Sequence, residues 1–320
     1  MDRARMLALC ESGQWTLDAI DWSRPPRQLS PTVEREVVQY FVDMAEIELF
    51  AGALFAEQRR RARDPVLRAI FESFVADEER HSRAAKRLAK HFNTRALQSY
   101  EPSASLLAFR PRFLRMLEHL SAEIANGYIV GGELILDIAL LRSIDDYVDD
   151  PTCHDVIALI NRDESRHVAV DYHMVEFYAS PEWLAEEAAQ PKRPVGERLR
   201  ALASFAGVVA TARPFIEDVF IAPMSRVDPG RRRMRDAFKR MQLLGAKPGV
   251  AARPFSRFLL TLQFVYTHPT TRWALAPLAE RLVGVPGEYI EELYTKDEWA
   301  RAEQMSFEEL AREALSAKLS

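Results

Sequence analysis

Apolar residues recur along most of this chain at the three- and four-residue spacing of amphipathic helices, and long stretches lack the alternation typical of β-strands. We therefore predict an all-α protein. The first half should contain four long helices, with a longer link around Pro102 between the second and the third. The expected ranges are 32–61, 65–91, 111–147 and 151–178, with the link at 93–110.

Two short links and one long link describe a four-helix bundle with one crossover, which is the ferritin-like topology. We expect residues 31–180 to form this bundle and residues 1–30 to form an N-terminal arm. Prolines and Pro-Gly pairs divide the rest of the chain into shorter amphipathic helices, the last opened by a capping box from Ser306 to Glu309. Residues 181–320 should be a helical extension packed on the bundle, and the sequence leaves open whether it is a separate domain.

The strongest chemical signal is a motif that occurs twice, as Asp-Glu-Glu-Arg-His at 77–81 and as Asp-Glu-Ser-Arg-His at 163–167. Thirteen residues before each motif stands an aspartate followed by proline, Asp64 and Asp150, which is a helix-start signal. Within each motif the Glu and the His are three residues apart, so both lie on one helix face and can bind one metal ion. Two such helices form a dinuclear metal site when two further helices each add a carboxylate.

Two more glutamates fit this requirement. Glu48 precedes Glu78 by nearly the same interval as Glu133 precedes Glu164, the second interval being longer by one position. Both upstream glutamates have mainly apolar neighbours on their helix face, whereas Glu46 has polar ones. Alternatively, these glutamates pair with arginines or with one another, or their side chains extend outward to solvent. Four of them at matched spacing, together with two histidines, favour a metal site, because a buried unpaired carboxylate is costly.

We therefore expect a pair of divalent ions whose four positive charges balance four carboxylates. Oxygen and imidazole ligands without thiolates favour two iron ions, with a mixed manganese–iron pair as the alternative. Glu78 and Glu164 should bridge the two ions. The expected ligands are Glu48, Glu78 and His81 for one ion, and Glu133, Glu164 and His167 for the other.

The doubled motif, with a helical glutamate at a matched distance upstream of each copy, resembles the ferritin-like di-iron carboxylate oxygenases. These include bacterial multicomponent monooxygenases, acyl-carrier-protein desaturases and arylamine N-oxygenases. The resemblance covers residues 32–180. It implies that Asp77 and Asp163 each orient the histidine of the other repeat, and that Arg80 and Arg166 balance these aspartates. The alternative is an exposed Asp–Arg pair on each helix.

Three positions depart from these relatives. Ala85 stands where ribonucleotide reductase small subunits carry a radical tyrosine, and Ile160 stands where arylamine N-oxygenases carry a third histidine. Asp137 stands where desaturases and monooxygenases often have threonine. The chain is therefore not placed in one family. Asp137 is a candidate for proton delivery, and a hydrogen bond to a ligand is the alternative role.

The resemblance implies an O₂-dependent non-heme di-iron oxygenase or oxidase that hydroxylates, N-oxygenates or desaturates a small organic or carrier-bound acyl substrate. An external ferredoxin or flavin reductase would supply electrons. The alternatives are a ferritin- or rubrerythrin-like ferroxidase or peroxidase, and a non-catalytic helical scaffold. The long C-terminal extension favours an organic substrate, and we expect its pocket beside Gly52, Phe55, Gly131 and Gly132.

Composition indicates which partners and which cellular location to expect. With 43 Lys and Arg against 47 Asp and Glu, the net charge is −4, which implies no general attraction to nucleic acid or to an anionic membrane. The two cysteines form no Cys-x-x-Cys motif, and the N-terminus does not read as a signal peptide. We found no apolar run of 18 residues and therefore expect a soluble cytoplasmic protein. The sequence leaves open whether the protein forms a homodimer.

Overall fold

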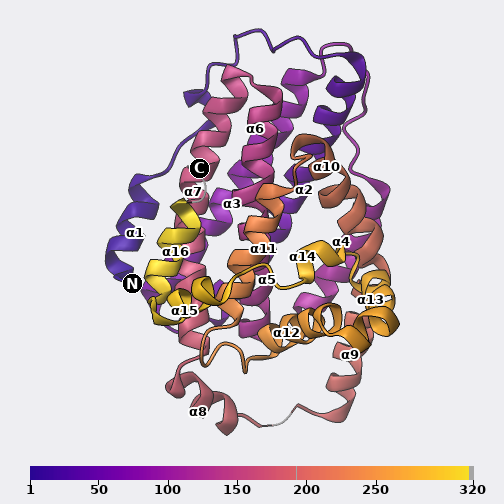
Figure 1. Cartoon of the computed structure of the whole chain (residues 1–320). Helices are drawn as coiled ribbons and strands as arrows, with labels where there is room; N and C mark the ends of the chain where they lie inside the picture. The colour runs from indigo at the N-terminus through magenta and orange to yellow at the C-terminus, as the bar shows by residue number, and fades with distance from the viewer. Residues whose placement is uncertain (192, 317–320) are drawn as a thin grey trace.

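The computed structural model of the chain describes residues 1–191 and 193–316. Within these ranges the ordered elements are helices and no β-strand occurs, which confirms the prediction of an all-α protein. Four long helical segments run side by side (Figure 1). They are α2 (Pro31–Arg61), α3 (Pro65–Phe92), the continuous segment α5–η2–α6 (Ala122–Leu134, Ile135–Leu141 and Arg142–Val148) and α7 (Pro151–Tyr178).

Three of these helices begin and end within one residue of the predicted ranges, because their start signals are local. Ser30, Asp64 and Asp150 act as N-caps whose side-chain oxygens accept hydrogen bonds from amides of the first turn, and a proline follows each of them. The middle part of the third segment, η2, is a π-helix. It directly follows the turn that carries Glu133.

The predicted start of the third long helix is wrong. Pro111 lies inside a separate helix, α4 (Ala104–Leu117), which forms part of the crossover. The bundle helix begins eleven residues later, at Ala122, where the Ser121 hydroxyl caps it by accepting a hydrogen bond from the Ile124 amide at 3.2 Å. The physical reason is that Pro111 occupies a helix interior here, although proline is more common in a first turn.

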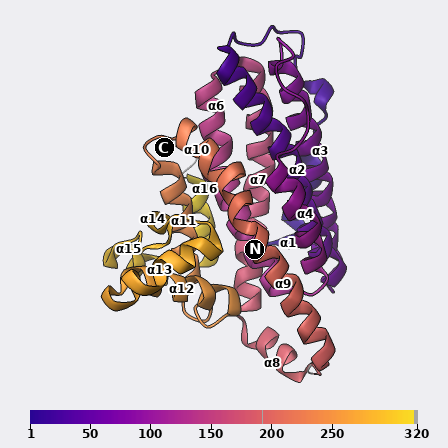
Figure 2. The same ribbon diagram turned by 90° about the vertical axis from the view of Figure 1, so that its right-hand side faces the viewer.

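The N-terminal arm contains α1 (Arg3–Ser12) and η1 (Leu17–Ala19) and packs along α3 and α7. The C-terminal extension lies against the other side of the bundle, where α11 and α12 contact α5 and α16 contacts α7 (Figure 2). Its elements are α8 (Pro181–Ala189), α9 (Val195–Ile216), η3 (Glu217–Ile221), α10 (Ala222–Val227), α11 (Arg232–Gly245), α12 (Pro254–Thr267), α13 (Pro269–Val283), α14 (Gly287–Ile290), α15 (Lys296–Gln304) and α16 (Phe307–Ser316). The predicted capping box is present, since the Glu309 amide donates to Ser306 and the Ser306 amide donates to Glu309.

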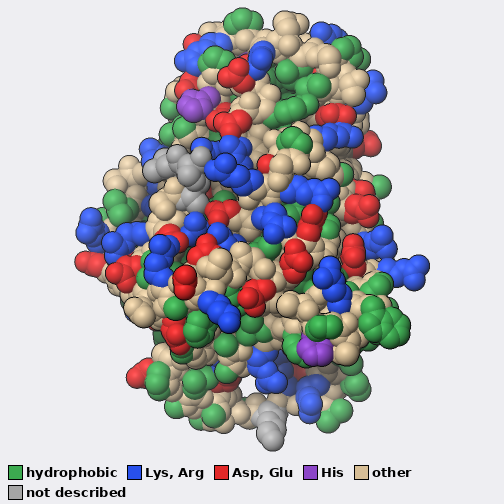
Figure 3. Space-filling model, in the orientation of Figure 1, with side chains coloured by type: hydrophobic (Ala, Val, Ile, Leu, Met, Phe, Trp, Pro, Cys, Tyr) green, Lys and Arg blue, Asp and Glu red, His purple; other side chains and the backbone are tan. Residues whose placement is uncertain are grey.

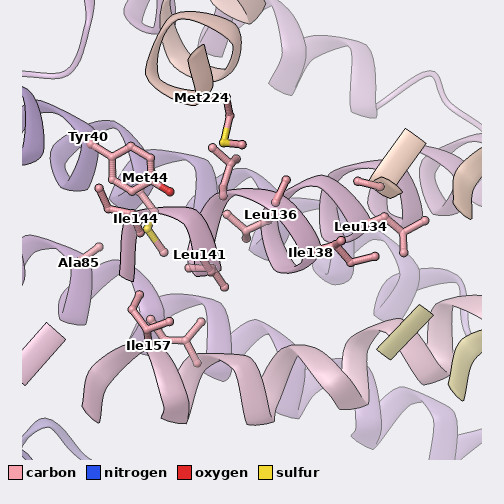
Figure 4. Packing of buried hydrophobic residues seen from close by; sticks show 14 of the residues in the cluster. Tyr40, Met44, Ala85, Leu134, Leu136, Ile138, Leu141, Ile144, Ile157 and Met224 are labelled. Atoms are coloured by element: carbon pink, nitrogen blue, oxygen red, sulfur yellow. The ribbon is translucent and has the colours of Figure 1, made fainter. Parts of the chain in front are cut away.

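One side of the core lies around the π-helix. Leu134, Leu136 and Leu141 belong to one buried cluster with Tyr40 of α2 and Ile157 of α7, and Leu141 lies toward Ile157 (Figure 4). All five side chains are buried. Aliphatic packing of this kind holds the third segment in place against both neighbours.

Basic and acidic side chains are mixed on the surface of the extension (Figure 3). Within the basic run of α11, Lys239 pairs with Glu298 at 2.9 Å and Arg240 pairs with Glu313 at 2.8 Å. These pairs make the face of α11 a mixed-charge surface rather than a patch of one sign.

The segment Ala122–Val148 is long and apolar enough to cross a membrane, with a mean hydropathy of 1.6 over 18 residues, contrary to the expectation from the sequence. However, 78% of that window is buried inside the protein. It also carries the buried carboxylates of Glu133 and Asp137. This is the environment of a core helix.

Two glycines of α5 provide a matched test of this packing. A Cβ at Gly127 would lie 2.6 Å from Phe255 of α12, whereas a Cβ at Gly132 meets nothing within 4 Å. We expect Gly127→Ala to lower the free energy of unfolding by about 1–3 kcal/mol through overpacking. Gly132→Ala should raise it by about 0.5–1 kcal/mol. Urea denaturation of both variants measures this, and equal effects would contradict the close approach of α12.

Candidate metal centre

The six predicted ligands come together inside the bundle, between all four long helical segments. None is more than 3% exposed. Glu48 extends from α2, Glu78 and His81 from α3, Glu133 from α5, and Glu164 and His167 from α7.

The donor atoms form two overlapping groups. In each group, all four atoms lie within 4.8 Å of one another. One group is Glu48, Glu78, His81 and Glu164, and the other is Glu78, Glu133, Glu164 and His167. The two glutamates expected to bridge, Glu78 and Glu164, are therefore the two that the groups share.

Glu46, which the sequence pattern disfavoured, lies outside this cluster. Its carboxylate pairs with Arg110 at 2.8 Å and with Lys86 at 3.5 Å. The polar neighbours of Glu46 along α2 thus indicated the correct face of the helix.

Both histidine rings direct Nδ1 toward the cluster and Nε2 away from it. Nδ1 of His81 lies 3.1 Å from the Glu164 carboxylate, and Nδ1 of His167 lies 3.0 Å from it. On the far side of each ring, His81 Nε2 lies 3.1 Å from Asp163 and His167 Nε2 lies 3.4 Å from Asp77. Each aspartate therefore contacts the histidine of the other repeat. A proton donated from Nε2 leaves the Nδ1 lone pair directed at the cluster.

Both motif arginines are buried beside these aspartates, so the alternative of exposed Asp–Arg pairs is wrong. Arg166 donates to Asp163 at 2.7 Å, and Arg80 donates to Asp163 at 3.0 Å and also pairs with Asp77. Burial by itself would raise the pKa of Asp163. Hydrogen bonds from His81, Trp15 and Arg80 outweigh burial and hold that pKa well below its ordinary value.

Two residues of the N-terminal arm complete this network, and the sequence analysis missed both. The Trp15 indole N–H donates to Asp163 at 2.7 Å, and the Arg80 guanidinium lies 5.1 Å from the centre of its ring. The Gln14 amide accepts from Arg80 at 2.7 Å and donates to Asp77 at 3.2 Å. Neither residue belongs to a repeat or a motif, so no local signal marks them.

The donor atoms of the cluster lack other partners. Both carboxylate oxygens of Glu48 and of Glu78 are buried without a hydrogen bond from any described residue, as is one oxygen of Glu133. Burial and the charge of Glu78 raise the pKa of Glu48 well above its ordinary value. Burial and the charge of Glu164 do the same to the pKa of Glu133. Two divalent cations would displace these protons and satisfy the orphaned oxygens, so the residues fit a dinuclear metal site.

The predicted pocket residues do not line a common cavity. Phe55 packs edge-on against the His167 ring at 5.1 Å. A Cβ at Gly52 would lie 3.3 Å from Glu78 Cβ, and a Cβ at Gly131 would lie 3.3 Å from Met241 of α11. Gly132 is exposed. Gly52 and Gly131 therefore allow close packing of their helices, and a substrate pocket beside these residues stays a prediction.

Two further aspartates lie next to the cluster. Asp137 is buried in the π-helix, one turn after Glu133, and belongs to neither group of donor atoms. Its role in proton delivery stays a prediction. Asp171 is fully buried one turn after His167, and burial raises its pKa well above the ordinary value.

Comparison of the sequence with known protein families and with curated proteins finds no match. The function of this chain is therefore argued from the cluster itself and from the elements that surround it.

The hydrogen bond from Trp15 to Asp163 should contribute measurably to stability. We expect Trp15→Phe to lower the free energy of unfolding by about 2 kcal/mol, because a bond to a buried charged acceptor is lost. Trp22→Phe is the matched control, since Trp22 donates to the neutral Leu17 carbonyl at 2.8 Å and should cost only about 1 kcal/mol. Urea denaturation of the metal-free protein measures both, and an equal cost would contradict the special role of Trp15.

Proposed function

We propose that this protein is a di-iron oxidoreductase that uses O₂ to oxidise a small organic or acyl substrate. The observation that carries the proposal is the pair of overlapping buried donor groups that share Glu78 and Glu164. Carboxylate and imidazole donors without thiolates suit iron, and they also suit a manganese–iron pair.

The roles of the ligands follow from their places in the two groups. Glu48 and His81 would hold one ion, and Glu133 and His167 the other. Glu78 and Glu164 would bridge. Ferrous ions, when bound there, supply electrons that activate O₂. Two ions held by only these six residues would have coordination positions left for O₂ and substrate.

The surrounding residues keep this site dry and its histidines fixed. Phe74 lies 4.1 Å from the His167 ring, and Phe55 covers the same ring from another side. Such apolar walls exclude water that would compete with the substrate. Asp163 and Asp77 accept from the histidines and pair with the buried arginines, and they would keep the proton of each histidine on Nε2. A ferredoxin or flavin reductase would deliver the remaining electrons.

The C-terminal extension beside the bundle favours an oxygenase over a ferroxidase. Entry of iron requires a polar route, whereas the cavity that reaches α5 beside Val130 is lined mainly by apolar side chains. The helices α11 and α12, which a minimal iron-storage bundle does not need, form the outer wall of that cavity. An organic substrate fits such a wall better than a hydrated ion.

The first test is metal content. Protein loaded anaerobically with Fe(II) and desalted should retain two irons per chain and unfold at a higher temperature than the metal-free protein. Glu78→Ala and Glu164→Ala should lower occupancy at both positions, because each removes a bridge. Glu79→Ala is the matched control, since Glu79 is exposed on the same helix, and it should keep both irons. Elemental analysis with Mössbauer spectroscopy measures this, and full iron content in both bridge variants would contradict the assignment.

The second test separates the candidate reactions. When Fe(II) is added in steps under O₂, oxygen consumption without substrate should stop once two irons per chain are oxidised. Continued oxidation and mineral growth beyond two irons would instead identify a ferroxidase. Stoichiometric iron binding without any oxygen consumption would exclude both reactions.

A further inference from the structure

Three helices of the C-terminal extension carry most of the large hydrophobic side chains that are left exposed. Of the sixteen such side chains in the described ranges, nine lie on α9, α12 and α13, which make up less than a fifth of the chain. The most exposed is Trp273 of α13, at 79%. Because α13 packs against both α9 and α12, these side chains belong to one region of the molecule (Figure 1). The outward side of these three helices is called the α9–α13 surface.

The first half of α9 presents an apolar face to solvent. Every residue from 195 to 200 is exposed. Val195, Leu199 and Leu202 follow one another at four- and three-residue spacing, so they share one face of the helix. Val208 and Phe215, through which α9 is buried against the rest of the protein, lie on the opposite face. Neighbouring exposed apolar side chains of this kind mark an interaction site.

The same three helices are basic, although the whole chain has a net charge of −4. They contain six arginines and two glutamates. One arginine, Arg213, pairs with Glu217 at 3.8 Å. The other five are exposed and form no ion pair with any residue that the structure describes, and they are Arg198, Arg200, Arg257, Arg272 and Arg281. Figure 3 shows basic and hydrophobic side chains together at the lower right, over α13 and α9. The α9–α13 surface therefore combines unpaired positive charge with exposed apolar area.

Charge argues against a second copy of the chain as the partner of this surface. A symmetric dimer would place the same patch of both copies face to face, so arginines would meet arginines. Like charges brought together in an interface cost free energy. The partner should therefore be negatively charged at its surface and apolar beneath it.

A lipid bilayer with anionic head groups has both properties. Helices that lie in the membrane interface carry basic residues on one face and Trp, Phe or Leu on the other. Tryptophan favours the level of the head groups, and basic residues are attracted to anionic lipids.

We propose that the α9–α13 surface binds the surface of a membrane that contains anionic lipids. Leu199, Leu202 and Trp273 enter the boundary between head groups and acyl chains, and the five unpaired arginines contact lipid phosphates. Binding of this kind needs no metal, so it is independent of the proposed function.

Sedimentation with vesicles tests the chemistry of the partner. The full chain should bind vesicles made of equal parts phosphatidylcholine and phosphatidylglycerol about tenfold more tightly than vesicles of phosphatidylcholine alone. Added salt should weaken binding to the mixed vesicles, because it screens exposed charges. Equal binding to both kinds of vesicle, or binding to neither, would overturn the proposal.

Paired substitutions test the location. The double variant Leu199→Ser/Leu202→Ser removes apolar area, and Arg198→Glu/Arg200→Glu reverses charge. Each should weaken binding to the mixed vesicles at least about tenfold. All four side chains are exposed, so both variants should melt at the temperature of the unchanged protein.

The N-terminal arm offers a matched control. Leu9 and Arg5 are exposed on α1, which packs along α3 and α7 rather than on the extension. The variant Leu9→Ser/Arg5→Glu should bind the mixed vesicles normally. Binding that is unchanged in both α9 variants, or reduced equally in this control, would contradict the location.

Two further measurements separate a membrane from other partners. Lipids brominated on their acyl chains should quench the tryptophan fluorescence of the unchanged protein more strongly than that of Trp273→Phe, and equal quenching would contradict insertion of Trp273. Analytical ultracentrifugation without lipid should give the same oligomeric state for the unchanged protein and for Leu199→Ser/Leu202→Ser. A dimer that this variant dissociates would identify a second copy as the partner and overturn the proposal.

Discussion

The structure depends on the burial of four carboxylates and two imidazoles that face one another in the bundle interior. Without cations this arrangement opposes folding, because both desolvation and mutual repulsion disfavour the ionised carboxylates. The surrounding elements limit that cost in a definite way. Asp77 and Asp163 bind the outer nitrogens of the rings, and Arg80 and Arg166 neutralise the aspartates. The inward atoms are left with one another and with any cation that binds.

Both halves of the bundle bring an upstream glutamate next to a Glu-x-x-His motif, but the chain segments between them differ slightly in length. The segment from Glu133 to Glu164 is longer by one position than the segment from Glu48 to Glu78. A π-helical turn contains one residue more than an α-helical turn, and η2 begins at Ile135, two residues after Glu133. The extra residue is therefore absorbed inside the helix. Glu133 and the second motif can then meet in the same arrangement as Glu48 and the first motif.

The sequence could predict what local rules determine. Caps at Asp64 and Asp150 located two helices, and spacing with apolar neighbours brought Glu48 and Glu133 into the cluster. It could not predict the hydrogen bond from Trp15 to Asp163, because the two residues are 148 positions apart and the bond depends on where the N-terminal arm packs. The role of the glycine positions is undetermined from sequence for a related reason. A missing side chain beside a ligand looks the same in sequence whether a substrate or another helix fills the space, and Met241 fills it at Gly131.

The extension gives the bundle a property that its four long helical segments alone do not have. Gly127 lets Phe255 of α12 approach α5 closely, and this contact closes one wall of the cavity beside Val130. Most of this wall is apolar, and the buried Oδ1 of Asn126 accepts no hydrogen bond from any described residue. The packing of α11 and α12 therefore encloses a small space against α5 and α7 that the four long segments alone would leave open to solvent.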